Sequence, residues 1–247
     1  MNPLSVIILA IVQGLTEFLP VSSSGHLVIL QNLLPGFFEP GILLEVVLHA
    51  GTLVAVLFFF RQRLGSFLKI RFLWLLFIGT LPAVAVGLLL KNQIEILFQS
   101  VRTVGAALIV SGIINFLVDK FRIKDLNLRS KSAFVIGLAQ ALAIIPGLSR
   151  SASTILAATA QGVNKKEAVE FSFLLSVPAV FGAAVLELWS SNLVAVIDWP
   201  IYLVGFLTAV VFGYLAIVLV FRFIAKSNFK YFAYYCCLLG LAVLVLF

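Results

Sequence analysis

The chain has 247 residues, of which 62% are hydrophobic and only 11% are charged. A soluble domain carries about 25% charged residues, so this composition excludes a soluble globular protein and predicts an all-α polytopic membrane protein. At about 20 residues for each span, the length allows about six to eight membrane elements, which we expect to form one domain, residues 1–247. The net charge of +7 is informative only through the position of the charged residues.

The first apolar segment is interrupted by a polar break. An apolar stretch at residues 4–19 is followed by Pro-Val-Ser-Ser-Ser-Gly at residues 20–25 and by a short apolar run at residues 27–34. Proline removes a backbone donor, glycine permits left-handed torsions and clustered serines compete for backbone hydrogen bonds, so a continuous helix is not expected. Neither half is long enough to cross about 30 Å of hydrocarbon, which predicts a re-entrant hairpin.

The rest of the chain is expected to contain six full spans and a second hairpin. In the second hairpin, residues 132–145 and 151–162 flank a break that begins at Pro146. The expected full spans are residues 41–60, 72–90, 103–118, 168–189, 200–221 and 231–247.

Basic residues orient this arrangement. The connections at residues 61–71, 119–131, 163–167 and 222–230 hold four, five, two and three of the 17 Lys and Arg residues. Six spans and two re-entrant hairpins place all four connections on one face, which the positive-inside rule assigns to the cytoplasm. We therefore expect a protein of the bacterial cytoplasmic (inner) membrane with both termini on the outer side.

A weak internal repeat supports the same topology. Gln13 and Gln140 precede the two breaks and lie 127 residues apart, and Glu45 and Glu170 each open an apolar span. The halves, approximately residues 1–120 and 121–247, would enter the membrane from opposite sides as an inverted-topology repeat. Such folds place their site near the midplane, where the positive N-terminal ends of broken helices favour an anion.

Ionisable residues within membrane segments are costly and mark functional sites by default. Arg150 lies beside several hydroxyls, and a guanidinium matches phosphate oxygens as a bidentate fork, so the second break is a candidate phosphate cradle. Glu17 and the carbonyl of Gln13 offer hard oxygen ligands for Mg²⁺ or Ca²⁺. The remaining ionisable residues of this kind are His26, Glu45, His49 and Glu170; a lone His49 on an apolar face is more often a core residue, and the two glutamates lie near an interface.

Two motifs carry a resemblance to a known family. Residues 13–26, Gln-Gly-Leu-Thr-Glu-Phe-Leu-Pro-Val-Ser-Ser-Ser-Gly-His, resemble the N-terminal signature of the undecaprenyl pyrophosphate phosphatases, also called bacitracin resistance proteins. Residues 146–154, Pro-Gly-Leu-Ser-Arg-Ser-Ala-Ser-Thr, are similar to their second signature, and residues 170–175 also fit. Gln13 stands where the family often has Glu, which removes one anionic ligand, and Ala152 stands where it usually has Gly.

The resemblance implies hydrolysis of undecaprenyl diphosphate to the monophosphate and inorganic phosphate, which recycles the lipid carrier of cell-wall synthesis. It implies a divalent cation, Mg²⁺ or Ca²⁺, bound at Glu17 and Gln13. The implied catalytic residues are Ser23, His26, Glu17 and Arg150, and the implied phosphate-binding residues are Ser22, Ser149, Arg150, Ser151 and Thr154. The expected partners are the polyprenyl diphosphate, membrane lipid and, in a homodimer, a second copy of the chain, with no nucleic acid.

Three alternatives stay open at this point. Ser23 and His26 lie three residues apart at the start of the second half-helix, so the hydroxyl and the imidazole could meet. Ser23 as nucleophile with His26 as its base is favoured, but direct attack by His26, or by water on a metal at Glu17, uses the same residues. Glu17 and Arg150 could instead form a structural ion pair, although a buried pair of this kind seldom adds net stability. Inverted repeats with broken helices are also typical of transporters, so the alternative function is a polyprenyl-phosphate flippase.

Overall fold

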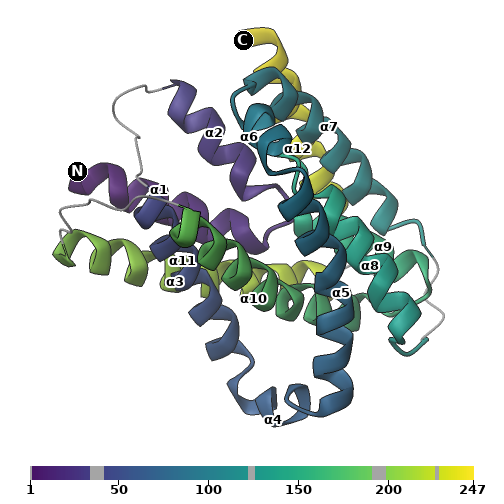
Figure 1. Cartoon of the computed structure of the whole chain (residues 1–247). Coiled ribbons are helices and arrows are strands. Elements are labelled where there is room, and N and C mark those ends of the chain that lie inside the picture. The colour runs from purple at the N-terminus through teal and green to yellow at the C-terminus, as the bar shows by residue number, and fades with distance from the viewer. Residues whose placement is uncertain (1, 34–41, 122–125, 191–198, 226–227) are drawn as a thin grey trace.

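The computed structural model describes residues 2–33, 42–121, 126–190, 199–225 and 228–247, and over these residues the regular secondary structure is entirely helical (Figure 1). The helices are α1 (Pro3–Phe18), α2 (Ser23–Leu33), α3 (Ile42–Phe59), the 3₁₀ helix η1 (Arg61–Arg63), α4 (Leu64–Phe67), α5 (Ile70–Leu89), α6 (Lys91–Phe98), α7 (Val101–Val118), α8 (Ser130–Leu142), α9 (Arg150–Ala160), α10 (Lys165–Ser190), α11 (Trp199–Ala225) and α12 (Lys230–Leu246).

Both predicted breaks interrupt the helical structure where the sequence indicated. The first separates α1 from α2, and the second separates α8 from α9. These four helices have 16, 11, 13 and 11 residues. At 1.5 Å per residue, each is shorter than the roughly 30 Å of hydrocarbon that a full span must cross.

Among the described residues, α5, α7, α10 and α11 are each long and apolar enough to cross a membrane. A fifth span is obtained if α3 is joined to η1 and α4, which continue it after a bend of 60°. The chain is therefore a multi-pass helical membrane protein. α12 is an apolar helix of 17 residues and is shorter than these spans. The short helix α6 was not expected from the sequence.

The helices pack in a reciprocal pattern. α1 packs on α11 and α8 packs on α5, while α3 contacts α11 and α10 contacts α5. α7 and α12 lie side by side in the upper part of Figure 1 and form a closely packed pair. α3 also contacts α10. Backbones approach at Gly240 of α12, where an added Cβ would lie 2.6 Å from the carbonyl oxygen of Gly105.

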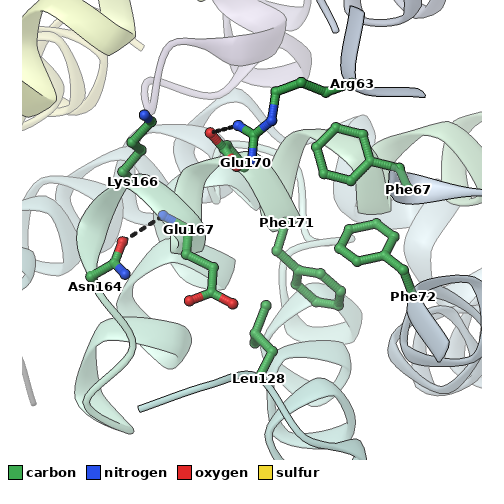
Figure 2. Close-up of a pocket in the computed structure, with 9 residues that line it drawn as sticks. All are labelled: Arg63, Phe67, Phe72, Leu128, Asn164, Lys166, Glu167, Glu170 and Phe171. Atoms are coloured by element: carbon green, nitrogen blue, oxygen red, sulfur yellow. Dashed lines mark hydrogen bonds and ion pairs between the residues drawn. The ribbon is translucent and has the colours of Figure 1, made fainter. Parts of the chain in front are cut away.

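The connections rich in Lys and Arg adjoin at one end of the molecule. Arg63, just after α3, forms an ion pair with Glu170 of α10. Asp119, just after α7, accepts a hydrogen bond from Lys165 Nζ at 2.7 Å and from the backbone N–H of Lys230 at 3.2 Å. A cavity of about 330 Å³ lies between three of these connections, and Figure 2 shows the Arg63–Glu170 pair on its wall. Its lining is Arg63, Phe67, Phe72, Leu128, Asn164, Lys166, Glu167, Glu170 and Phe171.

Candidate functional site

The two breaks lie against each other. A Cβ added to Gly25, in the first turn of α2, would lie 3.1 Å from the Cα of Gly147 in the second break. Ser22 has a φ of +69°, and among the described residues it is the non-glycine residue with a positive φ; Gly147 has a φ of +90°. Such a backbone conformation costs a non-glycine residue free energy and often accompanies functional sites. The chain is thus turned sharply at both breaks, and the turns meet.

The two helices that leave the breaks begin in the same way. Ser22 Oγ accepts a hydrogen bond from the N–H of Gly25 at 3.3 Å, and Ser149 Oγ accepts one from the N–H of Ala152 at 3.3 Å. Each cap hydroxyl is also paired with the serine two residues further on, at 3.3 Å and 3.2 Å. Serine is among the preferred helix N-caps because it satisfies a free N–H group. Two N-terminal helix ends are therefore brought together, and such ends attract anions.

Glu17 is the centre of the site. It lies on the last turn of α1 and is 8% exposed. One carboxylate oxygen, Oε1, accepts a hydrogen bond from Arg150 Nη2 at 2.7 Å. The other, Oε2, accepts from Ser23 Oγ at 2.8 Å and from Gln13 Nε2 at 2.9 Å. A single carboxylate therefore joins α1, the start of α2 and the start of α9.

Arg150 is held between the two halves of the chain. Besides its contact with Glu17, it donates through Nη1 to the carbonyl oxygen of Ser172 on α10 at 3.3 Å. The hydroxyl of Ser172 lies 2.6 Å from Thr154 Oγ1. A guanidinium has five N–H groups, and within the described residues two of them have a protein acceptor. The others are available to a ligand.

Within the described residues, His26 makes no hydrogen bond to Ser23, although the sequence favoured His26 as the base for Ser23. Its Nδ1 lies 2.7 Å from the carbonyl oxygen of Ser22, and its Nε2 lies 2.7 Å from the hydroxyl of Tyr235 on α12. The hydroxyl of Ser23 donates to Glu17 instead. The hydrogen-bonding partner of Ser23 is therefore a carboxylate, because the i, i+3 spacing that suggested the histidine does not aim both side chains at one point.

Three further ionisable residues fall in different places. His49 belongs to the site, since its Nδ1 lies 2.9 Å from Gln13 Nε2 and 3.8 Å from Glu17 Oε2. Glu45 lines a small cavity beside Gln13 and His49. Glu170 lies apart from Glu17, in the ion pair with Arg63.

Sequence reasoning missed two polar residues on α7 that hold the breaks. Asn115 Nδ2 donates to the carbonyl oxygen of Pro20 at 2.6 Å. Ser111 Oγ donates to the carbonyl oxygen of Gly147 at 2.9 Å and accepts from the N–H of Ser149 at 2.8 Å. Both side chains are fully buried. The available signal was a pair of uncharged polar residues four apart in an otherwise apolar span, which a search for ionisable groups passes over.

The divalent cation expected at Glu17 and Gln13 stays a prediction, which the chemistry of the side chains there bears on. Within the described residues, no group of three or more His, Cys, Asp and Glu residues is arranged to hold a metal ion. However, Gln13 Oε1 is buried and has no hydrogen-bond partner. Buried polar atoms normally have one, so this oxygen beside Glu17 is suited to an additional donor or cation.

Comparison with known proteins covers almost the whole chain. The family described as bacitracin resistance protein BacA matches residues 6–242. A protein named undecaprenyl-diphosphatase from Carboxydothermus hydrogenoformans is 42% identical over 257 residues, covering 100% of this chain and 98% of that protein. Proteins of the same name from Methanosphaera stadtmanae and Elusimicrobium minutum are 37% and 41% identical, covering 98% and 99% of this chain and 97% and 98% of those proteins.

Proposed function

This chain belongs to the bacitracin resistance protein BacA family. We propose that residues at its two breaks together bind and hydrolyse a lipid diphosphate. The chain is a membrane phosphatase that converts undecaprenyl diphosphate to the monophosphate and inorganic phosphate. Its full-length relatives carry the name undecaprenyl-diphosphatase. This reaction recycles the lipid carrier of cell-wall synthesis and gives the family its bacitracin resistance. The observation that carries the mechanism is the carboxylate of Glu17, which binds Ser23 and Arg150 from opposite breaks.

Ser23 is the nucleophile in this proposal, and Glu17 is the base that contacts it. The hydroxyl of Ser23 already donates to Glu17 Oε2 at 2.8 Å, which is the hydrogen bond that proton transfer requires. As Ser23 Oγ bonds to the terminal phosphorus, its proton passes to Glu17, the bond to the bridging oxygen breaks and undecaprenyl phosphate leaves. Water then attacks the phosphoserine and breaks the bond between phosphorus and Ser23 Oγ. The proton held by Glu17 returns to Ser23 Oγ, the oxygen of the water leaves in inorganic phosphate with one of its protons, and the other proton passes to solvent.

Arg150 and the two helix ends hold the diphosphate. The N–H groups of Arg150 that have no protein acceptor supply a fork for phosphate oxygens, and the side chain is 15% exposed, so it borders space that a ligand can reach. The N-termini of α2 and α9 add backbone donors and the positive ends of two helix dipoles. Phosphoryl transfer is accelerated mainly by this kind of positioning and charge stabilisation. Ser149, Ser151 and Thr154 support the loop through the caps and bonds described above.

A divalent cation fits beside Glu17. The buried Oε1 of Gln13 has no partner, and the Glu17 carboxylate accepts three hydrogen bonds and has room for a further ligand. Mg²⁺ commonly binds through one or two protein oxygens together with substrate phosphates and water. When bound, such an ion would neutralise charge on the diphosphate oxygens. Gln13 and Glu17 are the residues that would hold it.

We also propose a finer membrane topology of six full spans and two re-entrant hairpins in an inverted-topology repeat. The reciprocal packing of α1 on α11 and of α8 on α5 supports two halves that exchange their hairpins. The clustering of the basic connections at one end supports a cytoplasmic face there, with both termini on the outer side of the bacterial inner membrane. The homodimer stays a prediction.

Release of phosphate from polyprenyl diphosphate by the purified protein in detergent tests the proposal. With Mg²⁺ or Ca²⁺ present, we expect the wild type to release phosphate and Ser23→Ala to lose activity by at least about 100-fold, because the nucleophile is removed. Ser5→Ala, at the far end of α1, is the matched control and should retain activity. Labelling the terminal phosphate should leave label on the wild-type protein after a rapid quench, and none on Ser23→Ala.

Two results would contradict the mechanism or the function. Full activity of Ser23→Ala would exclude Ser23 as the nucleophile. An absence of phosphate release by the wild type, with translocation of polyprenyl phosphate across vesicles, would favour the flippase over the phosphatase.

A further inference from the structure

Both ring nitrogens of His26 are engaged, and the two partners come from different halves of the chain. Nδ1 lies 2.7 Å from the carbonyl oxygen of Ser22, and Nε2 lies 2.7 Å from the hydroxyl of Tyr235, which is 209 residues away in sequence. The two rings are nearly parallel, with planes 3° apart and centroids 5.7 Å apart. The imidazole is therefore held at both ends.

The identity of the partners determines which nitrogen carries the proton. A carbonyl oxygen only accepts hydrogen bonds, so Nδ1 must be the nitrogen that donates to Ser22. In the neutral ring Nε2 then has the lone pair, and the hydroxyl of Tyr235 must be its donor. The partner of a histidine's other nitrogen commonly sets the tautomer in this way. Nε2 is thus the nitrogen of His26 that is able to accept a proton.

The helix that carries Tyr235 is anchored to the first break independently of this contact. The next residue, Cys236, is buried, and its Sγ lies 3.7 Å from the carbonyl oxygen of Pro20. Asn115 of α7 donates to the same oxygen, and α7 packs closely on α12. Tyr235 therefore reaches His26 from a helix that these buried contacts hold in place against the first break.

We propose that Tyr235 is a positioning residue for the phosphatase reaction. The Ser22 carbonyl makes Nε2 the proton-accepting nitrogen of His26, and the hydroxyl of Tyr235 holds the imidazole in one orientation. Removal of the hydroxyl leaves one anchor, the Ser22 carbonyl, about which the ring can turn. The role of His26 at the reacting phosphate is the one that the family resemblance implies, and it rests on the proposed function, whereas the hydrogen bond itself does not.

Tyr234 provides a matched control for Tyr235, and the two histidines of the chain give a simple ¹⁵N NMR spectrum. Tyr234 is adjacent on α12, is 58% exposed and has no hydrogen-bond partner within the described residues, whereas Tyr235 is 46% exposed and bonds to His26. The sequence contains only two histidines, so a sample labelled with ¹⁵N in histidine shows two imidazoles. A His49→Gln variant identifies which signals belong to His26.

The experiment compares Tyr235→Phe with Tyr234→Phe in the full-length protein in detergent. At alkaline pH, we expect Tyr235→Phe to move the Nε2 signal of His26 and to leave the signals of His49 in place. With polyprenyl diphosphate and divalent cation, kcat should fall roughly three- to tenfold, the amount typical of one lost hydrogen bond, with KM within about twofold. Tyr234→Phe should match the wild type in both measurements.

Several outcomes would overturn the proposal. An unmoved Nε2 signal in Tyr235→Phe would mean that the hydrogen bond is absent. A moved signal with unchanged kcat would mean that the bond does not position His26 for the reaction. Equal losses in both tyrosine variants would indicate a general disturbance of α12. If the signal moves but the wild type releases no phosphate, the proposed function fails while the tyrosine–histidine bond stands.

Discussion

The two breaks are built on one backbone plan but carry opposite chemistry. Each begins a helix with a capping serine, and the caps are 127 residues apart, the same offset that relates Gln13 to Gln140. At that offset, Ser23 of the first break corresponds to Arg150 of the second, and Glu17 corresponds to Ile144. The first break therefore has the hydroxyl and the acid, and the second has the cation.

This division explains why neither half forms a site alone. The Glu17 carboxylate has its charged partner 133 residues away, across the interface between the breaks. A buried carboxylate without a partner is costly, and so is a buried guanidinium. Each half supplies the charge that offsets the burial of the other's charge, and the packed pair is also the candidate active centre.

The largest effect is expected from removing the cation of the second break. Arg150→Ala should lower phosphate release by at least about 100-fold, because it removes the phosphate fork and leaves Glu17 buried without its partner. Arg150→Lys should fall between the wild type and Arg150→Ala, because lysine keeps the charge but loses the bidentate geometry. The steady-state rate of phosphate release measures both.

Arg102→Ala is the control for that comparison. Arg102 lies at the start of α7 and donates to the carbonyl oxygen of Phe247, away from both breaks. It should leave the rate unchanged. A rate for Arg150→Ala near that of the wild type would mean that the second break does not bind the diphosphate.

A smaller effect is expected from removing the side chains of α7 that bind each break, and it should differ between the two breaks. Asn115→Ala loses the bond to Pro20 in the first break, so we expect it mainly to lower kcat, by about tenfold. Ser111→Ala loses both bonds to the second break, which carries Arg150, so we expect it mainly to raise KM by a similar factor. Initial rates over a range of substrate concentrations distinguish these effects.

Thr103→Val provides the control on the same helix. Thr103 bonds to Ser100 at the beginning of α7 and contacts neither break within the described residues. If Ser111→Ala and Asn115→Ala change kcat and KM equally, the first break does not act mainly in the reaction and the second does not act mainly in substrate binding.

The smallest effect is expected from adding a second carboxylate beside Glu17. Gln13→Glu places a second carboxylate beside Glu17, which is unfavourable unless a cation binds between them. We expect activity without added divalent cation to fall, and the half-saturating Mg²⁺ concentration to fall by about tenfold. A metal titration of phosphate release measures this.

Gln140→Glu is the matched substitution in the second half. Gln140 donates to the carbonyl oxygen of Gly79 and makes no hydrogen bond to a carboxylate within the described residues, so the metal titration of Gln140→Glu should not change. If both substitutions shift the titration equally, or neither does, Gln13 is not a metal ligand.

Much of the fold was predictable because composition and helix-breaking residues act locally. The expected span at residues 103–118 is observed as Val101–Val118, and both breaks interrupt the helices as expected. Proline, glycine and clustered serines end a helix wherever they occur, without information from the rest of the chain. The site residues on the breaks followed from the cost of placing charge in a membrane.

The partners within the site were less predictable, because each depends on how distant helices pack. The i, i+3 spacing of Ser23 and His26 suggested a pair, yet Ser23 bonds to Glu17 and His26 bonds to Tyr235. His49 was treated as a probable core residue from its sequence context, but the packing of α1 against α3 brings it to Gln13. Side chains on one helix turn are close in sequence without being aimed at the same point.

Local composition and residue types were enough to predict a multi-pass helical membrane protein with two polar breaks, the first preceded by an acidic residue and the second containing a basic one. These features depend on local composition and on the free energy of placing polar groups in hydrocarbon. The packing of the helices established that Glu17 bridges Ser23 and Arg150, that α7 holds both breaks, and that α12 brings Tyr235 to His26. Those contacts join residues far apart in the chain, so they exist only once the helices have packed.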